Sequence, residues 1–144
     1  MTKDVVLTME ATQYYPGEEP QNSITRVPAE YYLRNGSHYV MFEENQEGFT
    51  ENVKGMLKIK KGSVELSKKG LIQSHMLFEK DLRYATEYKT PFGGFMMDVC
   101  THQLNISERE DEIFMEIKYS LETEGQPVTD CFIKITITEK QPVG

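Results

Sequence analysis

The sequence predicts an all-β protein, a single antiparallel up-and-down β-barrel of about 8–10 strands spanning residues 1–144. Two observations carry this prediction. Apolar and polar side chains alternate with a period of two in several segments, and turn-forming residues recur at short intervals between those segments. A convincing helix is missing, because the best helix formers, "SHMLFEKDLRYA", lack a clean apolar stripe. At most one helical turn is expected, around residues 78–82.

The alternation is clearest in three segments, "NVKGMLKIK", "EIFMEIKYSLE" and "CFIKITIT". A strand with one solvated face divides its side chains in this way, whereas a helix does not. The last two segments are expected to pair as a hairpin through "TEGQP". The residues expected to face inward are Val53, Gly55, Leu57 and Ile59, then Ile113, Met115, Ile117, Tyr119 and Leu121, then Cys131, Ile133, Ile135 and Ile137.

Turn signals divide the chain into strands. They are "RNGS" at 34–37, "NQEG" at 45–48, "KKG" at 60–62 and 68–70, "PFGG" at 91–94, "SERED" at 107–111 and "EGQP" at 124–127. The predicted strands are 3–14, 24–34, 38–44, 50–60, 63–68, 71–78, 83–90, 94–106, 112–123 and 129–138. The stretch "PGEEPQNS", residues 16–23, is predicted to be a surface loop or flap.

Short strands joined by tight turns must protect their hydrogen-bonding edges, and closing the sheet removes those edges. A barrel is therefore favoured over a sandwich. Small barrels either fill their centre with side chains or keep a cavity for one small ligand. The sequence leaves these two alternatives open, and it also leaves open whether two barrels associate as a homodimer.

Composition and charge limit the kinds of molecule that the protein is expected to bind. The net charge is −7, which argues against nucleic acid. Six lysines cluster between Lys54 and Lys69, where they form either a local phosphate-binding patch or a solvated strand face that resists aggregation. No secretory signal is seen and no apolar run is long enough for a membrane helix, so a cytoplasmic protein that does not contact the membrane is expected.

The sequence offers no pattern for a cofactor or a metal. Cys100 and Cys131 lie far apart, without a CxxC spacing, and are expected to be reduced and packed. The three histidines occur singly, whereas zinc sites need three or four convergent ligands. We therefore expect no cofactor and no metal site.

The order of the strand patterns resembles a known family. The segments "EYYLRNGSHYVMFEE", "VKGMLKIKKGSVELSKKG", "TPFGGFMMDVCTHQLNI", "IFMEIKYSLE" and "IKITI" are similar to the YwiB-like family of small bacterial proteins. The resemblance runs from about Glu30 to Glu139. It implies a calycin-like, lipocalin-type barrel in the bacterial cytoplasm, and it supplies no activity and no catalytic residues to carry over.

Candidate ligand-binding residues follow from side-chain direction. If Val40 and Phe42 face the core, alternation places His38 and Glu44 on the same side, at the two mouths of the barrel. Glu44 then either begins a solvated turn or lines a cavity opening, where partial burial would suit it to acid or base chemistry.

Further candidates are an arginine and two tyrosines. Arg26, Glu30 and Tyr32 share one side of their strand and, inside a barrel, would orient a carboxylate ligand, although the same set fits a surface position. Tyrosines such as Tyr119 would give a barrel interior both packing and directed polar contacts. The candidate ligand-binding residues are Arg26, Tyr32, Phe42, Glu44 and Tyr119.

Three hypotheses for function remain. The favoured one is a non-enzymatic barrel that binds a small organic ligand. The second is a cofactor-free enzyme that acts on a small carboxylic acid through an inward tyrosine and glutamate. The third is a protein-interaction module that uses the outside of the sheet.

Overall fold

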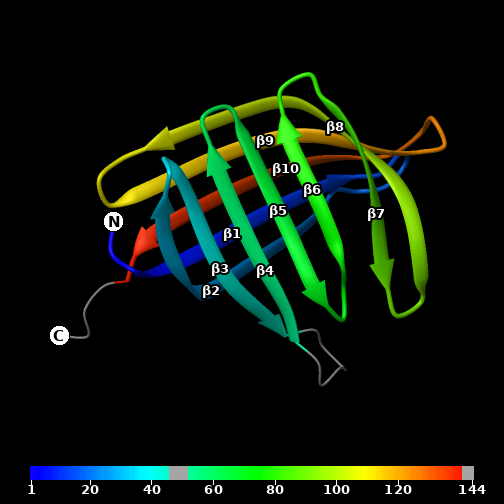
Figure 1. The fold of residues 1–144 in the computed structure, drawn as a ribbon. Coiled ribbons are helices and arrows are strands. Elements are labelled where there is room, and N and C mark those ends of the chain that lie inside the picture. The colour runs from blue at the N-terminus through cyan, green and yellow to red at the C-terminus, as the bar shows by residue number, and fades with distance from the viewer. Residues whose placement is uncertain (46–51, 141–144) are drawn as a thin grey trace.

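The computed structural model describes residues 1–45 and 52–140, which form one ten-stranded antiparallel sheet (Figure 1). The strands are β1 (Asp4–Tyr14), β2 (Gln21–Arg34), β3 (Ser37–Asn45), β4 (Asn52–Lys60), β5 (Ser63–Gly70), β6 (Ser74–Glu79), β7 (Arg83–Thr90), β8 (Gly93–Glu108), β9 (Glu112–Thr123) and β10 (Gln126–Glu139). The predicted all-β, up-and-down barrel is therefore confirmed. Part of the predicted turn at 45–48 and the first two residues of the predicted strand 50–60 lie outside the described residues.

The strands follow one another around the barrel in chain order. β1 pairs with β2 on one side and with β10 on the other, so the first and last strands lie side by side. The remaining seam, between β6 and β7, is joined by a single bridge, Gln73 to Lys89, and by the Thr86 hydroxyl, which donates to the carbonyl of His75 at 2.6 Å. The sheet is thus nearly closed.

The upper limit of one helical turn at residues 78–82 is not reached. Asp81 has a positive φ of 65°, and the chain reverses in a tight turn closed by the Leu82 amide donating to the Glu79 carbonyl. The predicted loop at 16–23 was wrong at its end. Its last residues, Gln21 to Ser23, already belong to β2 and pair with Ala11 to Gln13 of β1.

Side chains fill the centre of the barrel. The predicted inward residues are all buried except Tyr119 and Ile133, which are partly buried. All of them except Val53 and Gly55 belong to one contiguous apolar cluster, together with side chains from β1, β2, β3, β5, β6 and β8. The period of two thus fixes which face is inside, and a packed core occupies the middle of the barrel. Open space large enough for a ligand is found at its rim and on its outside.

Candidate functional site

An open cavity of about 540 Å³ lies at one mouth of the barrel. Two tight turns frame it: Asn35 and Gly36, both with positive φ, join β2 to β3, and Gly62 helps to join β4 to β5. The end of β8 lies opposite. The lining residues are Gly36, His38, Ile59, Lys60, Lys61, Gly62, Leu104, Ile106 and Glu108. The floor is therefore apolar and the rim is polar.

A three-residue relay crosses this mouth. The Tyr31 hydroxyl lies 2.5 Å from Nδ1 of His38, and Nε2 of His38 lies 3.0 Å from Oε1 of Glu108. Tyr31 and His38 come from the neighbouring strands β2 and β3, whereas Glu108 ends β8, which is on the opposite side of the barrel. The relay thus joins two parts of the sheet that share no backbone pairing.

The protons in the relay can be assigned from the chemistry of its members. A carboxylate accepts hydrogen bonds, so Nε2 of His38 carries a proton that it donates to Glu108. In the neutral imidazole Nδ1 is then an acceptor for the hydroxyl of Tyr31. Burial, and then the charge of Glu108, raise the pKa of Tyr31, which keeps that hydroxyl protonated. The relay therefore presents His38 as a fixed N–H donor at the cavity.

Glu108 is the most exposed member of the relay. Its side chain is 52% exposed, whereas that of His38 is 16% exposed. An incoming anion could take the place of the Glu108 carboxylate on the His38 N–H without unpacking the imidazole. Lys60 and Lys61 at the rim supply positive charge for such a ligand.

Glu44 lies at the other mouth, as the alternation on β3 predicts. Its carboxylate is 3.4 Å from Nζ of Lys68, and its side chain is 12% exposed. Tyr88 is close by: burial, and then the charge of Glu44, raise the pKa of Tyr88. The neighbours of Glu44 are therefore a lysine and a tyrosine. Neither of them is the arginine that would orient a carboxylate ligand beside this glutamate.

The structure does not bring the five candidate residues together. Arg26 is exposed on the outer face, and Tyr32, on the same face, donates to Glu30 at 2.6 Å. Phe42 is buried in the core. Tyr119 packs against Phe78 in a tilted arrangement, with ring centroids 4.9 Å apart. None of these residues lines the mouth cavity.

Phe42 also borders a second open space. This groove, of about 550 Å³, lies over β2, β3 and β4. Three carboxylates line it, those of Asp4, Glu30 and Glu43, against the single cation of Lys54. Such a balance disfavours an anionic ligand, so the mouth cavity is the stronger candidate site.

Sequence reasoning missed the relay. Alternation predicts His38 at a mouth of the barrel, but the candidate ligand-binding residues include Tyr32 in place of its neighbour Tyr31, and neither His38 nor Glu108. The usable signal was alternation: Tyr31 shares the buried side of β2 with Ala29, and His38 shares that of β3 with Val40. Nothing local points to Glu108, because it is 70 residues away from His38 along the chain.

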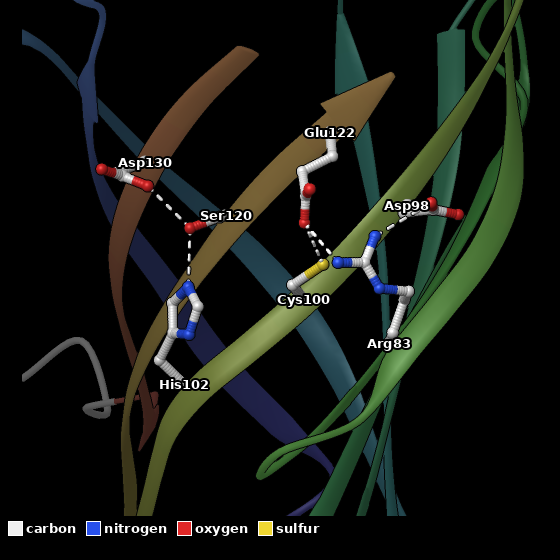
Figure 2. A network of polar contacts seen from close by, with 7 residues as sticks. All are labelled: Arg83, Asp98, Cys100, His102, Ser120, Glu122 and Asp130. Carbon is white, nitrogen blue, oxygen red and sulfur yellow. Dashed lines mark hydrogen bonds and ion pairs between the residues drawn. The ribbon is translucent and has the colours of Figure 1, made fainter. Parts of the chain in front are cut away.

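A second polar network lies on the outer face of β7, β8 and β9 (Figure 2). The guanidinium of Arg83 donates to Asp98 at 3.2 Å and to Glu122 at 2.9 Å. The Cys100 thiol donates to the same Glu122 oxygen at 2.8 Å. Burial, and then Glu122, raise the pKa of Cys100 to about 11. The thiol is therefore held protonated at neutral pH.

We expect Cys100 to be a slow nucleophile. Because the pKa of its thiol rises from 9.0 to about 11, the thiolate fraction at pH 8 should fall about 100-fold, and alkylation by iodoacetamide should slow accordingly. Replacement of Glu122 by Gln removes a charge that disfavours the thiolate and should speed alkylation by about tenfold. Peptide mapping over a pH series measures both effects, and equal rates in the two proteins would contradict the assignment.

Two further findings concern the described residues. They contain no group of three or more histidine, cysteine or acidic side chains that could hold a metal ion. They also contain no helix long and apolar enough to cross a bilayer.

Comparisons with known proteins show the family and the fold of the chain. A search of the curated proteins found no match. Among solved structures, the ywiB protein from Bacillus subtilis has the same fold: the TM-score is 0.85 over 96% of this chain and 93% of that chain, at 17% sequence identity. This match confirms the resemblance to YwiB-like proteins. Residues 8–135 match the family described as "Domain of unknown function (DUF1934)", so the chain belongs to the DUF1934 family.

Proposed function

We propose that this protein binds a small organic anion with an apolar body at the mouth of the barrel. The observation that carries the proposal is the cavity of about 540 Å³, where an apolar floor meets the His38 N–H and two lysines. Ligand sites are concave, mostly apolar, and contain a few polar groups that fix orientation.

The polar end supports an anion as the head group. The His38 donor is held by Tyr31 on one side and is shared with a half-exposed carboxylate on the other. A ligand carboxylate would replace Glu108 on the imidazole and would gain the charge of Lys60 and Lys61. Because charge-assisted hydrogen bonds are roughly twice as strong as neutral ones, such a head group gains more here than an alcohol.

The apolar end supports a short hydrocarbon body. Ile59, Leu104 and Ile106 line the cavity, and Ile59 also belongs to the barrel core. Each buried CH₂ group contributes about 0.8 kcal/mol. The packed centre of the barrel limits how deep a chain can reach, so a medium-length carboxylate fits the site better than a long one.

The relay also supports a second candidate, a cofactor-free acid–base enzyme that acts on a small carboxylic acid. A hydroxyl that donates to an imidazole held by a carboxylate is an arrangement used to activate nucleophiles and bases. Tyr31, however, is buried, with 8% of its surface exposed, and does not line the cavity. The hydroxyl that would react lies behind the imidazole, and for this reason binding is favoured over catalysis.

Octanoate tests the proposal in a thermal-shift assay, with 1-octanol as the neutral analogue. At ten times its Kd, a ligand that binds the native state stabilises it by about 1.4 kcal/mol, a shift of roughly 3–6 °C for a domain of this size. The shift should be lost or strongly reduced in the double variant Lys60→Gln, Lys61→Gln. Incubation with the protein should leave octanoate chemically unchanged.

The matched control is Lys54→Gln, Lys69→Gln. These two lysines are exposed and pair across β4 and β5, away from the mouth cavity. If this control loses the octanoate shift to the same degree, the effect is one of general surface charge. An equal shift with 1-octanol would likewise exclude an anion site.

A further inference from the structure

A hydroxyl on the outer face of the barrel has two acid–base partners (Figure 2). Oγ of Ser120 on β9 lies 2.6 Å from Nε2 of His102 on β8 and 2.6 Å from Oδ1 of Asp130 on β10. Ser120 and Asp130 face each other directly across the strands. This cluster is separate from the mouth cavity, and the proposed ligand site does not use it.

A bulge brings His102 to this position. Along β8, Thr101 pairs with Tyr119 and Gln103 pairs with Lys118, so His102 is the extra residue. Bulges of this kind redirect side chains and often lie beside functional sites. As a result, the imidazole lies against Ser120, although the register partner of Ser120 is Cys100.

The direction of the protons makes Ser120 the nucleophile of the cluster. The Asp130 carboxylate accepts the hydroxyl proton of Ser120, and the N–H of His102 in turn donates to Oγ. The neighbouring Cys100 thiol also donates to a carboxylate, that of Glu122, but the same Glu122 oxygen accepts from Arg83 at 2.9 Å. An arginine partner makes Glu122 the weaker base, so Ser120, whose proton is directed at Asp130, is the better nucleophile.

The two partners of Ser120 line a groove, and the partly exposed Ser120 lies between them, beside the lining residues. His102 and Asp130 line an open space of about 510 Å³ together with Tyr14, Lys118, Tyr119, Cys131 and Phe132. Tyr14 is 48% exposed, and Nζ of Lys118 lies 5.5 Å from the centroid of the Phe132 ring. The groove therefore combines an aromatic wall for an apolar group with an ammonium that could stabilise negative charge on a carbonyl oxygen.

We propose that Ser120 is an acyl acceptor that takes a short acyl group from small activated esters bound in this groove. Oγ of Ser120 forms a bond to the carbonyl carbon while its proton passes to Oδ1 of Asp130. The bond from that carbon to the leaving oxygen then breaks, and the proton returns from Asp130 to the leaving oxygen. The products are acyl-Ser120 and an alcohol, and no oxidant or other reactant is needed.

The test uses the full chain and p-nitrophenyl butyrate. Release of nitrophenol is followed by its absorbance, and peptide mapping by mass spectrometry locates the butyryl group. We expect butyrylation at Ser120, its complete loss in Ser120→Ala, and an acylation rate at least about 100-fold lower in Asp130→Asn, since general bases contribute at least this factor. Circular dichroism checks that the variants are folded.

Two controls match these variants. Ser107→Ala removes an exposed hydroxyl of β8, and Asp98→Asn removes a carboxylate that contacts Arg83 instead of Ser120; both variants should acylate at the wild-type rate. A butyryl group found only on Lys118 or Tyr14, no adduct at all, or an Asp130→Asn variant as fast as wild type would each overturn the proposal. The position of the adduct in the wild-type chain is decisive even where a variant fails to fold.

Discussion

Replacement of Gly55 by alanine should destabilise the protein by about 3 kcal/mol, the upper end of ordinary overpacking effects. Gly55 is buried in β4, opposite Phe42 of β3. A Cβ atom placed there would come within 2.7 Å of Cε1 of Phe42 and closer still to Cζ. Because Phe42 is 4% exposed and belongs to the core cluster, its ring can move away from Gly55 only by displacing its core neighbours. Chemical denaturation of the purified variant measures the loss.

A compensating change tests the cause. In the background Phe42→Leu, the substitution Gly55→Ala should cost much less, because the smaller side chain leaves space for the new methyl group. The control is Gly94→Ala, a second strand glycine, where the nearest atom to the new Cβ is the flexible carboxylate of Glu87 at 3.4 Å. Equal losses at Gly55 and Gly94 would show that glycine's backbone freedom matters here and the ring does not.

The pairing of Phe42 with Gly55 also shows what alternation can predict. The sequence placed both residues on the inner face, correctly, because a residue's side of a strand depends on its neighbours two positions away. It then proposed Phe42 as a ligand contact. Whether Phe42 can contact a ligand depends on the residue opposite it on β4, which is Gly55. The ring lies over this glycine and fills the space that a side chain would occupy.

Arg26 and Tyr32 show what alternation cannot predict in a strand with polar residues on both faces. Their mutual direction was predicted correctly, but which face of β2 is inside was left open. Ala29 and Tyr31 are the buried residues of this strand, and the strand also contains Pro28 and Glu30, so its apolar alternation is weak. Register in a strand with polar residues on both faces is poorly specified by its own sequence.

The contact between His38 and Glu108 could not be predicted from the sequence for a further reason. His38 and Glu108 meet because ten strands closed into one barrel brought β3 opposite β8. Strand periodicity predicts direction and turn signals predict neighbours in sequence, but contacts across the barrel depend on its closure and on the stagger of the strands. The local half of the relay, Tyr31 with His38, was accessible from alternation, and the distant half was not.

Alkaline solution should unfold the protein steeply, and Tyr119 should account for a large part of that slope. Burial first, and the neighbouring Cys131 next, raise the pKa of Tyr119 well above its ordinary value of 10.0. In the unfolded chain the phenol ionises near pH 10, whereas in the barrel it stays protonated. The stability contributed by this group is therefore complete below about pH 10 and falls by about 1.4 kcal/mol per pH unit as the pH rises toward the folded-state pKa.

The variant Tyr119→Phe isolates this contribution, because phenylalanine keeps the ring contact with Phe78 but has no proton to lose. Between pH 10 and pH 12 its free energy of unfolding should fall about 1.4 kcal/mol per pH unit less steeply than that of the wild type, as measured by urea unfolding at fixed pH. Tyr14→Phe is the matched control, since Tyr14 is 48% exposed and its hydroxyl reaches water in both states. Parallel slopes for the wild type and Tyr119→Phe would mean that the phenol ionises within the native barrel, so that water reaches Tyr119 beside Phe78.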